Sequence, residues 1–187
     1  LTFDLCIVGC GPAGVTVARE LAGRGRRIAV LESGGLLPTA HGAELKRVMS
    51  EGIHIRDESR ERAFGGASRT WAGVSTPLDP IDLEARPSLP RTGWPLQLEE
   101  LSSYYRDAAA RYGFPPLTLF GEHGFRRLRV HGQLHPAWRD LDEKIFLAPQ
   151  ELFDFARVHR ALFQGPDVDL WLGATGLWLS HAPDAGE

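Results

Sequence analysis

The 187-residue sequence contains few cysteines and no long apolar run, and each scarcity excludes a class of protein. Its two cysteines, Cys6 and Cys10, fall in an expected strand and in the turn after it, too far apart along an extended backbone to form a disulfide. Both are expected to be small buried residues, with no disulfide framework and no cysteine metal site. No apolar run reaches the roughly 20 residues that span a bilayer, so a transmembrane segment is not expected.

Basic charge is also in short supply, because 21 lysines and arginines face 24 acidic residues and the net charge is −3. Without a basic excess to neutralise phosphates, a nucleic-acid partner is not expected. The hydrophobic fraction of 43% and charged fraction of 24% are typical of a soluble globular protein with one sizeable core. No charged and then apolar leader precedes the first expected strand, which favours a cytoplasmic location, although the sequence does not begin with methionine.

The first 35 residues carry the best-defined pattern in the sequence. An apolar run from Phe3 to Val8 predicts a parallel strand covered on both faces. A glycine-rich turn follows, and Val15, Val17, Ala18 and Leu21 then predict a helix that ends before Gly23. The run from Ile28 to Leu31 predicts a second strand, closed by Glu32.

This strand, turn, helix, strand and acid together predict a dinucleotide-binding site. Gly9 makes the tight turn, Gly11 lets the backbone approach a pyrophosphate, and Gly14 lets the helix pack closely on the strand. The helix start attracts the anion, and Glu32 accepts hydrogen bonds from the ribose hydroxyls, which disfavours NADP. The pattern does not separate NAD from FAD. The residues expected at this site are Gly9, Cys10, Gly11, Pro12, Ala13, Gly14, Leu31, Glu32 and Ser33.

Residues 36–95 lack the strand and helix alternation of an ordinary NAD-binding domain. They are rich in glycine and proline and contain one expected helix, from about Ala43 to Met49. Such a stretch favours a segment that wraps a ligand or borders another domain. Within it, Arg60 to Gly73 combines paired glycines, hydroxyl groups, arginines and a tryptophan, which suits a flavin or a phosphate. A glycine-rich surface loop is the open alternative.

With both segments in view, the sequence resembles the amino-terminal part of glucose–methanol–choline (GMC) oxidoreductases, mostly the pyranose-oxidase and gluconate- or fructose-dehydrogenase-like branches. The first fingerprint continues into Leu-Glu-Ser-Gly at Leu31 to Gly34. The second flavin segment of that family matches an arginine, two glycines, a small residue, a serine and a tryptophan. Its expected FAD contacts here are Arg62, Gly65, Gly66, Ala67, Ser68, Trp71 and Gly73.

Further matches cover most of the chain. Residues 77–82 and Gly93-Trp94-Pro95 resemble family stretches, and apolar spacing predicts a helix from Leu98 to Tyr112 that Gly113 ends. Residues 166–175 resemble the strand that returns beside the adenine, with Ala174 as a cofactor contact. The resemblance implies a three-layer α/β, Rossmann-like FAD-binding domain around a mainly parallel sheet, with an incomplete substrate domain. Its expected parts are residues 1–95 (first FAD-binding part), 96–150 (substrate side) and 151–187 (returning FAD-binding part).

The resemblance also implies what the protein does. Members of the family oxidise an alcohol, such as a sugar, by passing hydride to FAD, while a histidine near the carboxyl terminus accepts the proton. The sequence stops at Glu187, before those residues, so no catalytic residue is assigned. The chain alone is expected to be inactive, and a carboxyl-terminal partner chain is an expectation. Thr70 stands where relatives with covalent FAD carry histidine, which predicts non-covalent FAD. Gly176 replaces a usual hydrophobic residue beside the adenine.

Two other functions stay open: another flavoprotein class, such as an amine oxidase or a monooxygenase, or a truncated or split chain without catalysis. A metal site at His131 and His135 is not expected, because Gly132 and Pro136 oppose a shared helix face. A sugar-stacking platform of tryptophans, including Trp94 and Trp138, is disfavoured. Core positions are expected for Trp171 and Trp178, and a solvated face for residues 126–129.

Overall fold

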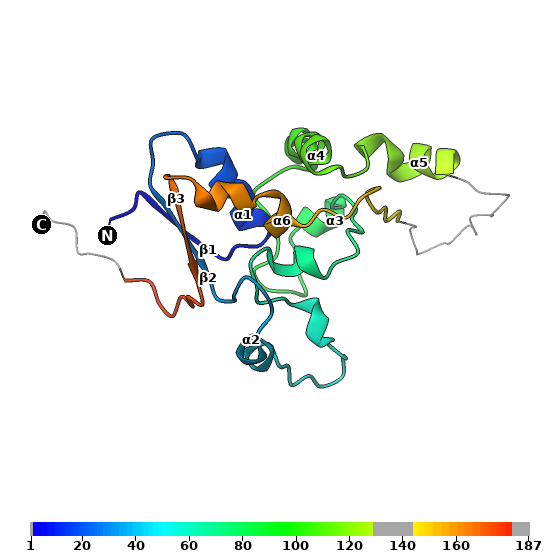
Figure 1. The fold of residues 1–187 in the computed structure, drawn as a ribbon. Coiled ribbons are helices and arrows are strands. Elements are labelled where there is room, and N and C mark those ends of the chain that lie inside the picture. The colour runs from blue at the N-terminus through cyan, green and yellow to red at the C-terminus, as the bar shows by residue number, and fades with distance from the viewer. Residues whose placement is uncertain (1, 129–143, 181–187) are drawn as a thin grey trace, which may run out of the picture. The chain divides into compact units, whose positions relative to one another are not determined.

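The computed structural model describes residues 2–128 and 144–180 (Figure 1). The chain divides into two compact units. The first unit comprises Leu1–Trp71 together with Asp154–Glu187, and the second comprises Ala72–Phe153. These bounds differ from those of the segments 1–95, 96–150 and 151–187 expected from the sequence. The assignment of those segments to FAD and to substrate stays a prediction.

A parallel sheet of three strands organises the first unit. Its order is β1 (Leu5–Val8), β2 (Ile28–Glu32) and β3 (Val168–Leu172), with Val8 opposite Leu31 and Glu32 opposite Leu172. Helix α1 (Pro12–Leu21) makes the crossover that two parallel neighbours need. The predicted mixed α/β class with a parallel sheet is confirmed, and it is consistent with a Rossmann-like FAD-binding fold.

The core of this unit lies around β2, the central strand. Ile28 and Val30 are fully buried, as are Val15 and Ala18 on the inner side of α1. Helix α6 (Phe155–Val158) and the 3-10 helix η4 (Arg160–Gln164) precede β3, and Phe155 is the largest fully buried side chain. The largest buried side chains of this unit therefore gather around β2, α1 and α6.

The expectation that β1 is covered on both faces is wrong. Val8 is 65% exposed and Cys6 is also exposed, whereas Cys10 is buried as predicted. In the part of the chain that the structure describes, β1 pairs with β2 alone, so it is an edge strand whose alternate side chains face outward. Both cysteines are free thiols, in agreement with the sequence analysis.

The segment after β2 contains more short helices than predicted. They are α2 (Ala40–Leu45) and the 3-10 helices η1 (Asp57–Ser59) and η2 (Gly66–Arg69). Helix α2 overlaps the predicted span from Ala43 to Met49, but it begins and ends a few residues earlier. The earlier start is capped by the Thr39 hydroxyl, which accepts a hydrogen bond from the Gly42 N–H (3.0 Å). Met49 lies beyond the helix and is fully exposed.

The second unit is helical. It contains α3 (Pro80–Leu83), α4 (Leu98–Tyr112), the 3-10 helix η3 (Leu117–Leu119) and α5 (Gly121–Leu128). Helix α4 has the predicted limits and ends at Gly113, whose φ of 69° is the left-handed cap conformation. At its end, buried Tyr112 packs edge-on against the rings of Phe114 and Phe153.

The two tryptophans expected in the core are not there. Trp171 is 45% exposed on β3, which has one neighbouring strand among the described residues, and Trp178 is 80% exposed in the coil after that strand. Arg126 and Arg127 are exposed, as predicted. His131, His135, Trp138 and Arg129 lie outside the described residues. Within the described ranges, no group of three potential metal ligands occurs, and no helix is long and apolar enough to cross a membrane.

Candidate dinucleotide-binding site

The turn between β1 and α1 has the close packing that the sequence predicts. Gly9 adopts a φ of 97°, and its N–H donates to the Leu31 carbonyl (2.7 Å). A Cβ added at Gly14 would collide with the Gly9 carbonyl oxygen. Only glycine at both positions lets α1 begin so close to the end of β1.

Gly11 differs from Gly9 and Gly14, because no backbone angle or close contact within the described residues requires a glycine there. Its φ is −81°, which any residue adopts, and an added Cβ would meet no atom within 4 Å. The adjacent amino-terminal end of α1 has no side-chain cap, so amides of its first turn keep their hydrogen-bonding capacity. Open space beside uncapped helix amides is an arrangement that can receive an anion such as a pyrophosphate.

Glu32 lies beneath this turn and is only 5% exposed. Its Oε2 accepts a hydrogen bond from the Cys10 N–H (2.9 Å), and its Oε1 accepts one from the Gly34 N–H (2.7 Å) and one from the Ser33 hydroxyl (3.4 Å). A carboxylate offers about four acceptor sites, so these three donors leave room for one further donor. A ribose hydroxyl would suit that remaining position.

The thiol of Cys10 stays protonated at this site. Burial, and then the negative charge of Glu32, raise the pKa of its thiol to about 12. The thiol therefore stays neutral at physiological pH and adds no second negative charge where an anion would bind.

The second predicted segment meets the first turn directly. The Gly65 N–H donates to the Cys10 carbonyl (2.9 Å), and a Cβ added at Gly66 would lie 3.0 Å from the Gly11 Cα. Both glycines have positive φ, 96° and 55°. The fold therefore brings together two glycine-rich segments that are far apart in the sequence.

Other residues of the second segment, Ser68 and Trp71, contact α6, whereas Ala67 is exposed to solvent. The Ser68 side chain is buried, and its hydroxyl donates to the Gly65 carbonyl (2.6 Å) and accepts from the Phe155 N–H (3.3 Å). Trp71 packs against the ring of Phe155, with 6.2 Å between ring centroids, and Ala67 is exposed. Ser68 and Trp71 thus hold the segment onto α6, and their contacts with a cofactor stay predictions.

Arg62 brings an unused donor to the site. Its Nη2 donates to the Thr175 hydroxyl (3.3 Å), but its buried Nε forms no hydrogen bond with any described residue. The Ala174 N–H donates to the Glu32 carbonyl (2.9 Å), so the residue after the end of β3 lies beside the acid, and its contact with the adenine stays a prediction. An unpaired buried guanidinium N–H is costly, and an anion would satisfy it.

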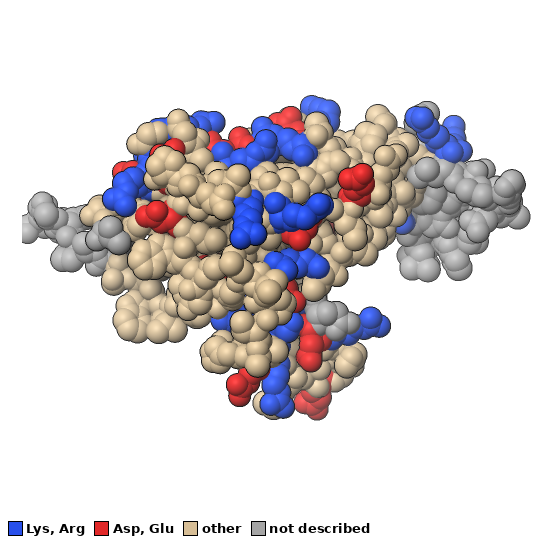
Figure 2. Space-filling view, in the orientation of Figure 1, with Lys and Arg blue, Asp and Glu red and all other residues tan. Residues whose placement is uncertain are grey.

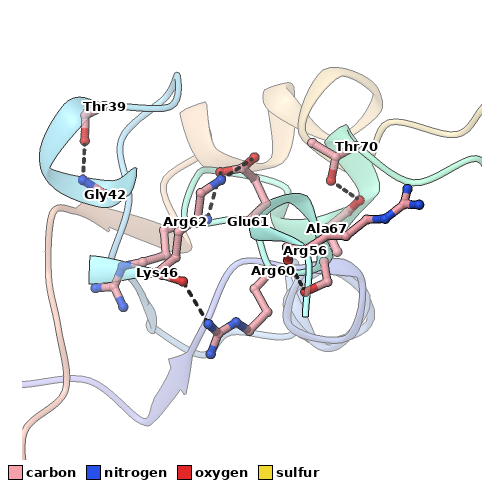
Figure 3. Close-up of polar contacts among 10 residues, drawn as sticks. Thr39, Gly42, Lys46, Arg56, Arg60, Glu61, Arg62, Ala67 and Thr70 are labelled. Carbon is pink, nitrogen blue, oxygen red and sulfur yellow. Dashed lines mark hydrogen bonds and ion pairs between the residues drawn. The ribbon is translucent and has the colours of Figure 1, made fainter. Parts of the chain in front are cut away.

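A largely buried ion pair fixes the backbone before Arg62. The Lys46 ammonium lies 3.3 Å from Glu61 Oε1, which also accepts the Arg62 N–H (3.0 Å). Arg60 Nη2 donates to the Lys46 carbonyl (2.8 Å), as Figure 3 shows. These contacts tie the second segment to the end of α2 and hold Arg62 in place.

One predicted residue belongs to the other compact unit. Two further contributors, Gly34 and Thr175, are absent from the predicted site residues. Gly73 belongs to the second compact unit, so it is not described together with the others. Gly34 was quoted only as part of a motif, yet it donates to Glu32, and a Cβ there would collide with the Arg62 carbonyl. Thr175 carries no local signal, because its partner Arg62 is 113 positions away in the sequence.

The chemistry of these groups fits FAD. Helix amides can receive a pyrophosphate, the space beside Gly11 lets it approach, and Glu32 can accept from a ribose. No curated protein matches the chain. The family described as FAD dependent oxidoreductase (DAO) matches residues 4–165, well over half of the sequence. The chain belongs to this family of FAD-dependent oxidoreductases, whose cofactor is FAD.

Proposed function

We propose that this chain binds FAD non-covalently and forms the FAD-binding part of a GMC-type oxidoreductase that oxidises an alcohol, such as a sugar. The observation that carries the proposal is the open space at Gly11, a glycine that the fold itself does not need. It supports a binding role for the turn, since a ligand is then the remaining reason for the absence of a side chain. FAD, when bound, supplies a hydride acceptor.

The proposed holding residues act on different parts of the cofactor. Gly9 to Gly14 would hold the pyrophosphate, and Leu31, Glu32 and Ser33 the ribose. The segment Gly65 to Ser68, with Arg62, Trp71 and Gly73, would border the flavin, and Ala174 the adenine. The Thr70 hydroxyl donates to the Ala67 carbonyl (3.3 Å; Figure 3), and a threonine there supports non-covalent binding.

The alcohol substrate rests on the resemblance of the second segment and of Gly93-Trp94-Pro95 to GMC enzymes, because the family description names no substrate. The test is anaerobic mixing of the FAD-loaded chain, supplemented with the expected carboxyl-terminal partner chain that carries the catalytic histidine, with D-glucose, D-gluconate, benzylamine or D-alanine, followed by flavin absorbance. Bleaching by a sugar and not by an amine is expected. Bleaching by an amine would overturn the assignment in favour of an amine oxidase.

Bleaching by none of the four compounds would favour the other alternative, a chain that binds the nucleotide without catalysis. A control with dithionite, which reduces any bound flavin chemically, separates this result from a failure to load FAD. If dithionite bleaches the sample and the organic substrates do not, FAD binding stands and the alcohol proposal falls.

A further inference from the structure

A second concave site lies within the first unit, and its lining residues adjoin those expected to bind FAD but differ from them. It is a pocket of about 410 Å³ between the loop after β2, the second segment, and the α6–η4 stretch. Three arginines line it, Arg69, Arg157 and Arg160, against a single carboxylate, Asp154. None of the residues assigned to FAD above is among its lining residues. Basic side chains gather over α6 in the middle of the face drawn in Figure 2.

The three guanidinium groups differ in how many hydrogen bonds they form within the protein. Arg69 Nη1 donates to the carbonyls of Leu36 (2.9 Å) and Phe64 (3.4 Å), which fixes this guanidinium in the pocket wall. Arg157 and Arg160 are exposed, and their guanidinium groups make no ion pair or hydrogen bond within the described residues. Two cationic groups are therefore available to a ligand.

The single acid does not neutralise them. Asp154 Oδ1 accepts the Arg157 backbone N–H (3.1 Å) and so caps the start of α6. Three positive groups thus face one negative group that already has a structural use. The excess of positive charge favours an anion over a neutral ligand.

The walls that carry these charges are apolar and well anchored. Phe64 and Ala156 are buried lining residues, and the ring of Phe64 packs edge-on against Phe163 of η4, with 5.0 Å between centroids. Arg157 of α6 and Arg160 of η4 both line the pocket. The pocket combines a fixed apolar wall with a cationic rim.

We propose that this pocket binds a phosphate monoester carried on an apolar or aromatic body. A phosphate dianion can engage both free guanidinium groups through paired hydrogen bonds, which a single carboxylate does less completely. The body would lie against Phe64 and Leu37, and the volume is in the range of small-molecule sites.

The test is calorimetric titration of the full chain with phenyl phosphate, with and without saturating FAD. Phenyl phosphate is expected to bind in both cases, and at least about tenfold more tightly than phenol or inorganic phosphate. The double variant Arg157→Gln/Arg160→Gln should bind it at least about tenfold more weakly. A matched control, Arg24→Gln/Arg26→Gln, removes two exposed arginines before β2 and should bind it within about twofold of the wild type.

Several results would overturn the proposal. They are no binding of phenyl phosphate by the wild type, loss of binding on FAD addition, equal weakening in the control variant, or no weakening in the pocket variant. Inorganic phosphate binding as tightly as phenyl phosphate would contradict the role of the apolar wall. FAD affinity, measured separately for each variant, is expected to stay unchanged, so failure of this site is distinguishable from failure of the FAD site.

Discussion

The sequence has two lysines, and each forms an ion pair with a different exposure to water. The Lys46–Glu61 pair is largely buried, with side chains 15% and 5% exposed, and it holds the backbone that carries Arg62. The Lys144–Asp79 pair (2.6 Å) is more exposed, at 28% and 52%. Burial determines how much stability is lost when one partner of a pair is removed, because an unpaired buried charge costs far more free energy than an exposed one.

Replacing Lys46 with methionine is expected to lower the free energy of unfolding by roughly 3 kcal/mol, because it leaves the Glu61 carboxylate buried without its cation. Denaturant unfolding measures this change. The matched variant Lys144→Met should lose no more than about 1 kcal/mol, since water screens its partner. Equal losses in the two variants would show that burial does not distinguish the pairs.

His159, at the junction of α6 and η4, makes stability depend on pH. Burial, and then the positive charge of Arg19, lower the pKa of its imidazole below 6.5 in the folded protein. Above pH 6.5 the imidazole is neutral whether folded or unfolded. As the pH falls below 6.5, the unfolded chain binds a proton more readily than the folded one, so stability decreases.

The variant His159→Gln should therefore lose less stability than the wild type between pH 7.5 and pH 5.5, where carboxylates stay largely ionised. Thermal unfolding at both pH values measures the difference. Parallel losses in wild type and variant would mean that His159 does not contribute to the pH dependence.

Among the helices and strands, α4 is one whose limits can be predicted from the sequence alone. Its limits, Leu98 and Tyr112, follow from apolar spacing and from Gly113, and the structure reproduces both. Gly113→Ala should cost about 1 kcal/mol, because alanine is strained at a φ of 69°. Gly165→Ala is the control, since φ there is −79° and its nearest contact is 3.5 Å. An equal loss in the control would contradict the cap explanation.

Elements that depend on distant partners were less predictable. The strands β1 and β2 and helix α1 follow from local periodicity. The resemblance implies only that both glycine-rich segments contact FAD, and it does not predict the contact of Gly65 with Cys10. The exposure of Cys6, Val8 and Trp171 was not foreseen, because the apolar pattern of a strand does not show how many strands cover it. The contact between Arg62 and Thr175 likewise has no trace in local sequence.

At the scale of the whole molecule, the account depends on the first unit acting as an FAD-binding domain. Its three strands, the turn after β1 and the segment from Arg62 to Trp71 converge on the carboxyl edge of one parallel sheet. Ligands of open α/β sheets bind at this edge. The family match supplies the identity of the cofactor, and the geometry supplies the residues that we propose to hold it.

The most direct test compares FAD binding by the wild type and by Gly11→Ala, using flavin absorbance after incubation with FAD and desalting, together with thermal unfolding without FAD. The wild type should retain flavin absorbance that heat and acid release. Gly11→Ala should unfold at the same temperature, because its Cβ meets no protein atom, yet bind FAD at least about tenfold more weakly. A wild type that retains no flavin, or a variant that binds FAD as well as the wild type, would contradict a pyrophosphate site beside Gly11.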